Sequence, residues 1–309
     1  MTVHKNSLLN ARDEVEGECF GQWLDRHGYC LGDGCVDAAS DAPMWALAGQ
    51  LSWVLSCSYD QVQGYPASVI LGFCRGLGLG LRAMMRPRRG IVRVDPSIDA
   101  LQLALAYGST LRCATAVSGV EIDAGSISAG GVEVAGERFD ALVVATEASA
   151  VRKVLRGAAR VFDEVEYQPS SIVLHCDASL MPPCRANWRA LNVTQKPGAG
   201  AGMSQLTVWL NAYYPECEFG RDTFETWNCL HAPREESVIK TAHFKRVVHT
   251  IETPHLLREI EAEQGVGRVW YAGSYAVHGM GLLEQAAVSG RSAAAGVLEH
   301  LFEGRDVRI

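Results

Sequence analysis

Apolar residues in the first third of the chain recur at the spacing of a helix face. Residues 13–28 and 42–56 place large apolar side chains three or four positions apart, which is the pattern of amphipathic helices. A further helix is predicted over residues 66–77, with proline in its first turn. The segment 97–108 predicts another, which serine opens and glycine stops. Residues 13–75 are therefore expected to be mainly helical.

In the middle of the chain the pattern becomes that of β-strands. Residues 111–122 alternate apolar and polar side chains and predict a strand. Residues 127–139 predict a hairpin that turns at the glycine pair 130–131. The run 139–146 is continuously apolar, as is typical of a strand buried on both faces. A helix over residues 149–155 is expected to follow.

A second sheet is expected as an insertion between residues 165 and 255. The segments 170–176, 205–213 and 223–229 have the composition of strands, and a glycine-rich loop at 197–202 separates the first two. This arrangement predicts a sheet domain that interrupts the rest of the chain.

The C-terminal segment predicts a short helix over 256–262, then a strand, a glycine-rich turn and a long helix. The strand is the apolar run 269–272, and the helix is rich in alanine, serine and glycine. The order of helices, strands, inserted sheet and final strand–turn–helix predicts a mixed α/β (α+β) fold with two interleaved domains.

The composition narrows the class of protein. The chain has 309 residues, of which 48% are hydrophobic, enough for two domains with a sizeable core. Its net charge of −7 argues against a nucleic-acid partner. Apolar windows such as 44–55 are too short for a transmembrane segment, and residues 1–12 lack the apolar run of a signal peptide.

The ten cysteines form no CxxC pair and no zinc-type cluster with histidine. Buried thiols in a reducing intracellular compartment, the cytoplasm or an organelle interior, are therefore expected. Cys30 and Cys35 are close together in a glycine-rich loop, and a local disulfide between them is the alternative.

Three glycine-rich segments imitate a nucleotide-binding loop. The segment 78–83 lacks a clean strand before it and has Pro87 soon after it, and 197–202 leads into a strand, so neither has the context of the fingerprint. The segment 278–294 follows a strand and opens a helix, whose N-terminus suits a phosphate or an electron-rich ring. A terminal helix packed on a sheet is the equal alternative.

No nucleophile–base set is visible in the sequence, so the catalytic residues are left unassigned. His175 lies in an apolar strand and is expected to be a hydrogen-bonded core residue, and His278 is expected to make structural hydrogen bonds or to face a ligand. His243 and His249 receive no role. The arginines of 82–93 predict a solvated surface, with a carboxylate site as the alternative. The tryptophans expected in the core of the sheet domain are Trp188, Trp209 and Trp227.

The segment 267–294, GRVWYAGSYAVHGMGLLEQAAVSGRSAA, resembles the C-terminal flavin-contacting segment of the FAD-dependent amine oxidase superfamily. Residues 139–155 resemble the strand and helix that follow the β-hairpin in that superfamily. Four segments resemble substrate-domain strands of its amine-oxidase-like, NAD/FAD-binding members: 173–188, 206–215, 225–238 and 243–250. The likeness covers nearly the whole chain.

The resemblance implies an incomplete FAD-binding, Rossmann-like domain interleaved with a substrate-type domain that holds an antiparallel sheet. Residues 1–109 would form the helical part of the substrate-type domain, and residues 110–164 the hairpin and strand of the FAD-type domain. Residues 165–255 would form the substrate-type sheet, and residues 256–309 the strand, turn and helix of the FAD-type domain. FAD is the implied cofactor, and the implied substrate is small and apolar or lipid-like.

The resemblance also implies cofactor contacts residue by residue. Gly273 and Ser274 correspond to residues near the FAD pyrophosphate, and Val117 to one that approaches the adenine. In the family the start of the last helix lies beneath the isoalloxazine ring, where the helix dipole stabilises the anionic reduced flavin. The corresponding residues here are Gly281, Leu282, Leu283, Glu284 and Gln285.

Two departures from the family pattern weaken the expected cofactor site. The family begins with a strand–GxGxxG–helix unit, and this sequence starts after that point. The family also places a Gly-Gly-Ser turn where this chain has residues 94–97. There Pro96 lacks an N–H group and Asp95 adds a negative charge.

Two hypotheses therefore stay open, and with them whether the chain is an enzyme. In the first, it is part of an FAD-dependent oxidoreductase whose nucleotide-binding half is on another polypeptide or lost. In the second, it is a non-catalytic, flavoprotein-derived subunit of a larger complex. In either case the strands 139–146 and 269–272 are expected to expose apolar faces and unpaired edges, which a partner chain or a rearranged N-terminal segment would cover.

Overall fold

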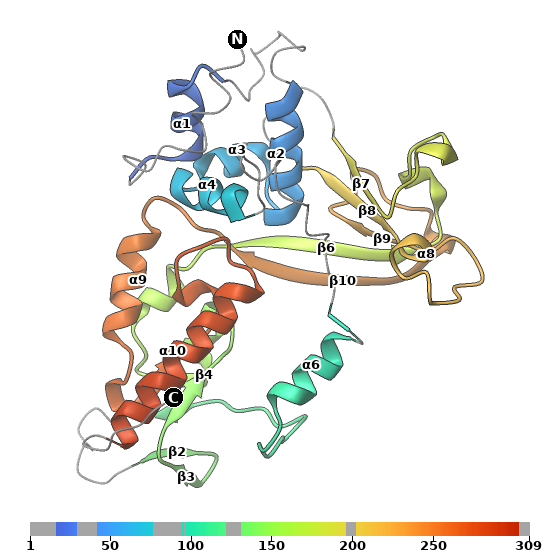
Figure 1. Cartoon of the computed structure of the whole chain (residues 1–309). Helices are drawn as coiled ribbons and strands as arrows, with labels where there is room; N and C mark the ends of the chain where they lie inside the picture. The colour runs from blue at the N-terminus through green and yellow to red at the C-terminus, as the bar shows by residue number, and fades with distance from the viewer. Residues whose placement is uncertain are drawn as a thin grey trace.

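The computed structural model describes residues 17–29, 42–76, 94–95, 97–121, 131–195 and 202–302. These residues form a helical layer, a five-stranded sheet, and a unit of short strands and helices that contains the C-terminal helix (Figure 1). The fold is the predicted mixed α/β class, with both parallel and antiparallel strand pairs.

The helical layer comes from the first third of the chain, as predicted. It consists of α1 (Phe20–Arg26), α2 (Ala42–Leu55), α3 (Tyr59–Gly64) and α4 (Ala67–Gly76). The short α3 was not predicted, and it begins at Ser58, whose hydroxyl accepts a hydrogen bond from the amide of Gln61. Phe20, Trp23 and Tyr65 belong to the buried cluster that joins these helices.

The inserted sheet is antiparallel throughout, with strand order β10–β6–β9–β8–β7. Its strands are β6 (Tyr167–His175), β7 (Leu191–Thr194), β8 (Gln205–Trp209), β9 (Phe224–Trp227) and β10 (Val238–Val247). The pattern of apolar residues predicted neither β7 nor β10, and the resemblance alone suggested a strand over residues 243–250, which overlaps β10. Most of β10 is exposed, so its sequence does not alternate as a half-buried strand does. Residues 210–213 were expected to extend β8, but they form the short helix α8 (Leu210–Tyr213).

The remaining elements pair in a parallel manner or form a hairpin. β11 (Val269–Tyr271) pairs with β4 (Leu142–Val144), β1 (Val120–Glu121) pairs with β5 (Leu155–Arg156), and β2 (Val132–Val134) forms a hairpin with β3 (Glu137–Phe139). The helices of this unit are α7 (Ala148–Val154), α9 (Thr253–Ala262) and α10 (Leu283–Leu301). Short 3-10 turns lie at Arg160–Asp163, Ala178–Leu180, Arg185–Asn187, Glu235–Ser237, Val266–Arg268 and Ser274–Ala276.

Two strand predictions in the middle of the chain were wrong. Of the described residues 111–121, only Val120 and Glu121 form a strand, and Leu111 is 60% exposed. Residues 111–119 form an irregular exposed segment, because no strand in the described part of the chain pairs with them. The hairpin turns at Ala135 and Gly136, both with positive φ, instead of at residues 130–131, since a two-residue turn of this kind matches the twist of the strands.

The prediction that residues 139–146 are buried on both faces was also wrong. Val144 is 4% exposed but Val143 is 42% exposed, and β11 is the one strand that pairs with β4 among the described residues. β11 itself is fully buried, since its three residues are at most 5% exposed. The exposed apolar surface expected for β4 is therefore present. The one expected for β11 is absent, because helix α10 packs against that strand.

Helix α6 (Ile98–Leu105) stands away from the rest of the molecule (Figure 1). Ser97 caps it by accepting a hydrogen bond from the amide of Ala100, and Gly108 follows with a φ of +82°. None of its residues is buried, although most are apolar. The predicted helix exists, but its apolar side chains contact solvent.

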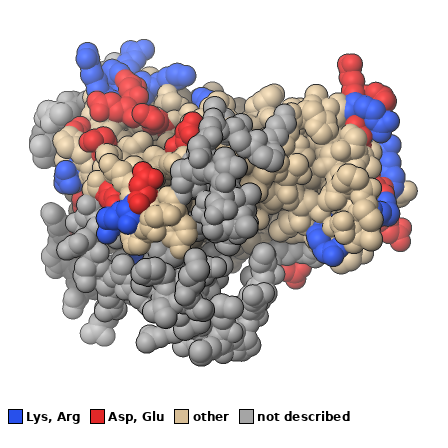
Figure 2. Space-filling view, turned by 90° about the horizontal axis from the view of Figure 1, so that it is seen from above, with Lys and Arg blue, Asp and Glu red and all other residues tan. Residues whose placement is uncertain are grey.

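Several predictions concern residues that lie outside the described part of the chain: Cys30, Cys35, the glycine segment 78–83, the arginine segment 82–93, Pro96 and most of the loop 197–202. Among the residues that are described, no helix has the length and hydropathy that a bilayer span requires. On the face shown in Figure 2, acidic and basic side chains are mixed near both ends, and uncharged side chains fill much of the area between them.

Candidate functional site

The turn between β11 and α10 brings together the predicted cofactor residues except Val117. Gly273 opens this turn, and its amide donates a hydrogen bond of 2.9 Å to Ser289 Oγ on α10. A Cβ atom at Gly273 would lie 2.4 Å from the ring of Tyr275, so the position requires glycine. Ser274 then begins a 3-10 turn. The backbone N–H of Gly273 is thus engaged in holding α10 against the strand.

Gly281, just before α10, packs directly on the segment that leaves β10. Its φ is +65°, and a Cβ there would lie 2.5 Å from Val247 Cγ1 and 3.6 Å from His249 Nε2. Leu282 follows as the N-cap residue, and its amide donates to Gln285 Oε1 at 3.0 Å. Only a glycine can occupy position 281 in this arrangement.

The first turn of α10 is open to solvent. Leu283 is 78% exposed, Glu284 is exposed, and no side-chain oxygen caps the amides of this turn. Because α10 has 19 residues, its N-terminus carries the partial positive charge of a long helix. Val117 lies instead on the irregular segment before β1 and is 38% exposed.

Beneath this turn lies His249, a residue to which the sequence assigned no role. Its side chain is 1% exposed, and neither ring nitrogen has a hydrogen-bond partner. Burial, together with the nearby imidazole of His278, lowers the pKa of His249 to about 4. The ring is therefore neutral at neutral pH and offers one donor and one acceptor. No periodicity marks this position, so only its surroundings could have revealed it.

Other buried polar groups lie close to His249, where the helical layer meets the end of β10. The hydroxyl of Tyr65 donates to the carbonyl oxygen of Val247 at 3.4 Å. Burial raises the pKa of the Cys57 thiol to about 12 and raises that of Tyr65 as well. Burial also lowers the pKa of Arg246. Cys57 is thus a protonated thiol and not a nucleophile.

An apolar cavity of about 670 Å³ lies between α2, α4 and one face of the sheet. Its carboxylate is Glu225, whose Oε1 atom accepts a hydrogen bond of 2.6 Å from Trp227 Nε1. The walls consist mainly of aliphatic and aromatic side chains, including Leu51, Trp53, Phe73, Leu206, Val208 and Tyr214. Such a lining suits an apolar molecule with a small polar end.

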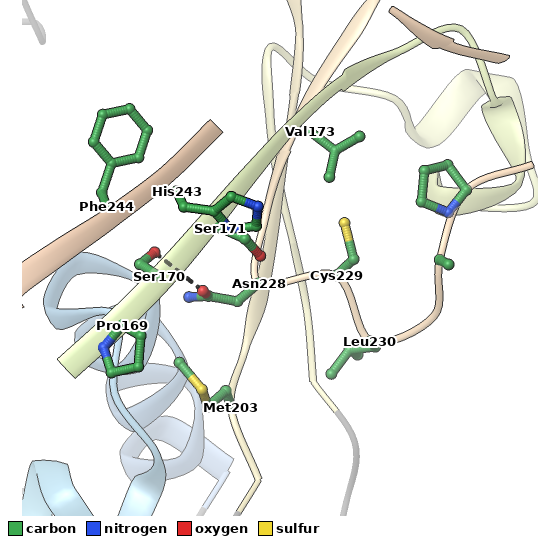
Figure 3. A pocket seen from close by; sticks show the side chains of 12 residues that line it. Pro169, Ser170, Ser171, Val173, Met203, Asn228, Cys229, Leu230, His243 and Phe244 are labelled. Carbon is green, nitrogen blue, oxygen red and sulfur yellow. Dashed lines mark hydrogen bonds between the residues drawn. The ribbon is translucent and has the colours of Figure 1, made fainter. Parts of the chain in front are cut away.

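A shallower groove of about 570 Å³ runs beside β6 and the loop after β9 (Figure 3). Asn228 has a left-handed backbone with φ of +52°, and its Oδ1 atom accepts a hydrogen bond of 3.2 Å from Ser170 Oγ. Its Nδ2 atom has no partner. Burial raises the pKa of Cys229 nearby, so the groove holds a protonated thiol and no evident nucleophile–base pair.

His175 is a hydrogen-bonded core residue, as predicted. It is fully buried, its Nε2 atom lies 2.7 Å from Thr226 Oγ1, and its Nδ1 atom accepts from the amide of Asp177. Burial would raise the pKa of the Asp177 carboxyl, but hydrogen bonds from Arg234 and Ser179 hold it well below its usual range. This network is structural, since His175 and Asp177 are buried and their side-chain polar atoms have partners within it.

Of the three tryptophans expected in the core of the sheet domain, two pack against each other and the third lines the apolar cavity. Trp188 packs edge-on against Trp209 with ring centroids 5.3 Å apart, and the guanidinium of Arg185 lies over Trp188. Trp227 lines the apolar cavity. The described cysteines are all free thiols, and no group of three metal-ligating side chains occurs among the described residues.

No protein-family model matches the sequence, and no curated protein does. Solved structures match by fold. A CLA-producing fatty acid isomerase from P. acnes superimposes with a TM-score of 0.53 at 12% identity, over 96% of this chain and 69% of the isomerase. An oxidoreductase from Methanosarcina mazei superimposes with a TM-score of 0.53 at 11% identity, over 95% of this chain and 71% of that protein. The chain therefore shares the α/β fold of these two proteins, and identities this low show the fold alone.

Proposed function

We propose that this chain is an FAD-dependent, oxidoreductase-like protein of the amine oxidase superfamily that needs a separate nucleotide-binding half for activity. The observation that carries the proposal is the start of α10, where an uncapped helix N-terminus lies beside an unpaired, buried histidine. A flavin bound there would supply the hydride chemistry, and the protein would supply binding and orientation.

The residues at the start of α10 fit a flavin ring better than a phosphate. The helix dipole favours negative charge near the first turn, but Glu284 already places a carboxylate there. The amide of Gly273 is engaged by Ser289 and is not free for a pyrophosphate. Gly281, Leu282, Leu283 and Gln285 would form the ring platform. The phosphates and the adenosine would then depend on the separate half, with Ser274 and Val117 as candidate contacts.

The apolar cavity beside α2 supports a small apolar or lipid-like substrate. Its lining is nearly all aliphatic and aromatic, and Glu225 can accept a hydrogen bond from one polar end of the molecule. Any catalytic role of Glu225 would require that the substrate also reach the start of α10.

The exposed surfaces of β4 and α6 support a protein partner. Val143 is 42% exposed on β4, whose second edge pairs with no strand in the described part of the chain, and Leu103, Leu105 and Tyr107 are at least 67% exposed. Open strand edges and contiguous apolar patches are sites of association. The same surfaces are compatible with the second hypothesis, a non-catalytic subunit of a larger complex. The free thiols of the described residues support a reducing intracellular compartment.

An absorbance spectrum of the purified chain, with and without added FAD, separates the two functions. Near-stoichiometric flavin bands would contradict the non-catalytic subunit. If no flavin binds even at millimolar FAD, the chain does not hold the cofactor unaided, and the experiment is repeated on the complex isolated from its source.

A further inference from the structure

His249 has an unsatisfied hydrogen-bonding capacity that the rest of the fold does not explain. Its side chain is 1% exposed, and neither Nδ1 nor Nε2 has a partner. Leaving a buried polar atom unpaired destabilises the folded state, and such atoms are rare in folded proteins unless a ligand or water satisfies them. Two unpaired nitrogens on one ring therefore indicate a missing partner.

The position of His249 points to where that partner would bind. Its Nε2 atom lies 3.6 Å from the place of a Cβ on Gly281, and the imidazole of His278 is close enough to affect its protonation. Both residues belong to the turn that leads into α10. The hydroxyl of Tyr65, a buried group of the same region, already donates to the carbonyl oxygen of Val247. His249 therefore faces the turn that leads into α10, and no side chain caps the N-terminus of that helix.

We propose that His249 is a positioning residue that hydrogen-bonds the polar edge of an isoalloxazine ring bound at the start of α10, an inference that rests on the proposed function. The pyrimidine edge of this ring carries carbonyl oxygens beside an N–H group. A neutral imidazole can donate to the first or accept from the second. Gly281, which has no Cβ, lets the turn before α10 lie directly against Val247 and His249.

Two substitutions at this position separate hydrogen bonding from packing. His249→Leu keeps a similar volume and removes both polar atoms, whereas His249→Gln keeps a donor and an acceptor. His243→Gln is the matched control, because His243 lies exposed on β10 of the same segment. The probes are riboflavin, which has the ring without the pyrophosphate, and FAD.

We expect His249→Leu to weaken binding of both probes roughly three- to tenfold, the effect of one hydrogen bond. The ligand-free Leu variant should unfold at the same urea concentration as the wild type or at a higher one, because it no longer buries unpaired nitrogens. A histidine that served only packing would show the opposite change in stability. The reduction potential of the bound flavin should fall in the Leu variant, since a donor to a ring carbonyl stabilises the reduced anion.

The results distinguish this inference from the proposed function. Wild type and His249→Leu that bind riboflavin and FAD equally, with the same flavin spectrum, would overturn the role of His249 and leave the flavin function standing. A wild-type chain that binds neither probe at millimolar concentration, alone and as the isolated complex, would overturn both. If the Leu variant does not fold, His249→Gln decides: a shifted flavin absorption band supports the inference, and an unchanged band with unchanged affinity overturns it.

Discussion

At the scale of single residues, the buried neutral state of His249 makes folding stability depend on pH. Burial lowers the pKa of the ring from its ordinary 6.5 to about 4. Between these values the unfolded chain binds a proton that the folded chain does not. Stability is therefore complete above pH 6.5 and is lost as the pH falls toward 4, by about 3 kcal/mol for the whole shift.

We predict that the free energy of unfolding of the wild type falls more steeply between pH 7 and pH 4.5 than that of His249→Leu. Urea denaturation at both pH values measures the difference. The neighbouring groups Tyr65, Cys57, Arg246 and His278 are present in both proteins, so their contributions cancel. Parallel pH profiles would show that His249 is protonated equally in the folded and unfolded chain.

The contact of Gly281 with Val247 gives a second residue-scale prediction. Gly281→Ala adds a Cβ 2.5 Å from Val247 Cγ1 at a φ of +65°. We expect a loss of about 2–4 kcal/mol, the sum of left-handed strain and overpacking. Gly136→Ala is the control, because Gly136 has a φ of +80° but open space around it. It should lose only the strain, about 1–2 kcal/mol. Equal losses in urea denaturation would show that the turn moves away from β10.

At the scale of elements, α10 shows why a helix rich in small residues follows the last strand. A Cβ on Gly296 would lie 2.6 Å from Trp270 Nε1, so this glycine lets the helix lie close on β11. Ser289 and Ala293 are also buried on that side of the helix. The small residues thus serve helix–strand packing, whereas the first turn of α10 is open to solvent.

Two glycines of α10 should respond oppositely to alanine. Gly290 has nothing near its missing Cβ, so Gly290→Ala should raise the unfolding free energy by about 0.5–1 kcal/mol through helix propensity. Gly296→Ala should lower it by about 1–3 kcal/mol, since Trp270 must shift. Thermal or urea denaturation of the pair measures both changes. A gain for both variants would contradict the close packing on Trp270.

Local patterns predicted elements well where one face is buried within a compact layer. Helices α2, α4 and α10 and strands β8 and β9 follow their apolar spacing. The apolar pattern did not reveal β10, because most of its residues are exposed and its pairing with β6 depends on residues far away in the chain. Residues 111–119 alternate but pair with no strand of the described residues, and only Val120 and Glu121 pair, with β5, so alternation alone did not make the segment a strand.

At the scale of the whole molecule, α6 stands away from the other described elements (Figure 1). It has no buried residue, and Leu103 and Leu105 are 67% and 77% exposed. An apolar helix in this state lowers solubility unless another surface covers it. Its exposure and the open edge of β4 are the features that argue most directly for association.

We predict that the purified chain self-associates and that Leu103→Glu with Leu105→Glu reduces this association. Both side chains are exposed, so the unfolding free energy should change by less than about 0.5 kcal/mol. Sedimentation velocity at several concentrations measures the association. As a control, Thr241→Glu changes an exposed residue of β10 and should leave it unchanged. A monomer at all concentrations in both proteins would contradict an uncovered apolar surface.

The sequence by itself determined the α/β class, most helices, the strands of the inserted sheet with buried faces, and the strand–turn–helix that ends in α10. These features depend on side-chain spacing within a few turns or one strand, which the sequence displays directly. The tertiary structure decided the buried state of His249, the contact of Gly281 with β10, the apolar cavity and the exposure of α6. Each of these depends on which distant segments meet, as Tyr65 and Val247 do across 182 positions of the chain. Burial and unpaired polar atoms are properties of such meetings, and no local pattern encodes them.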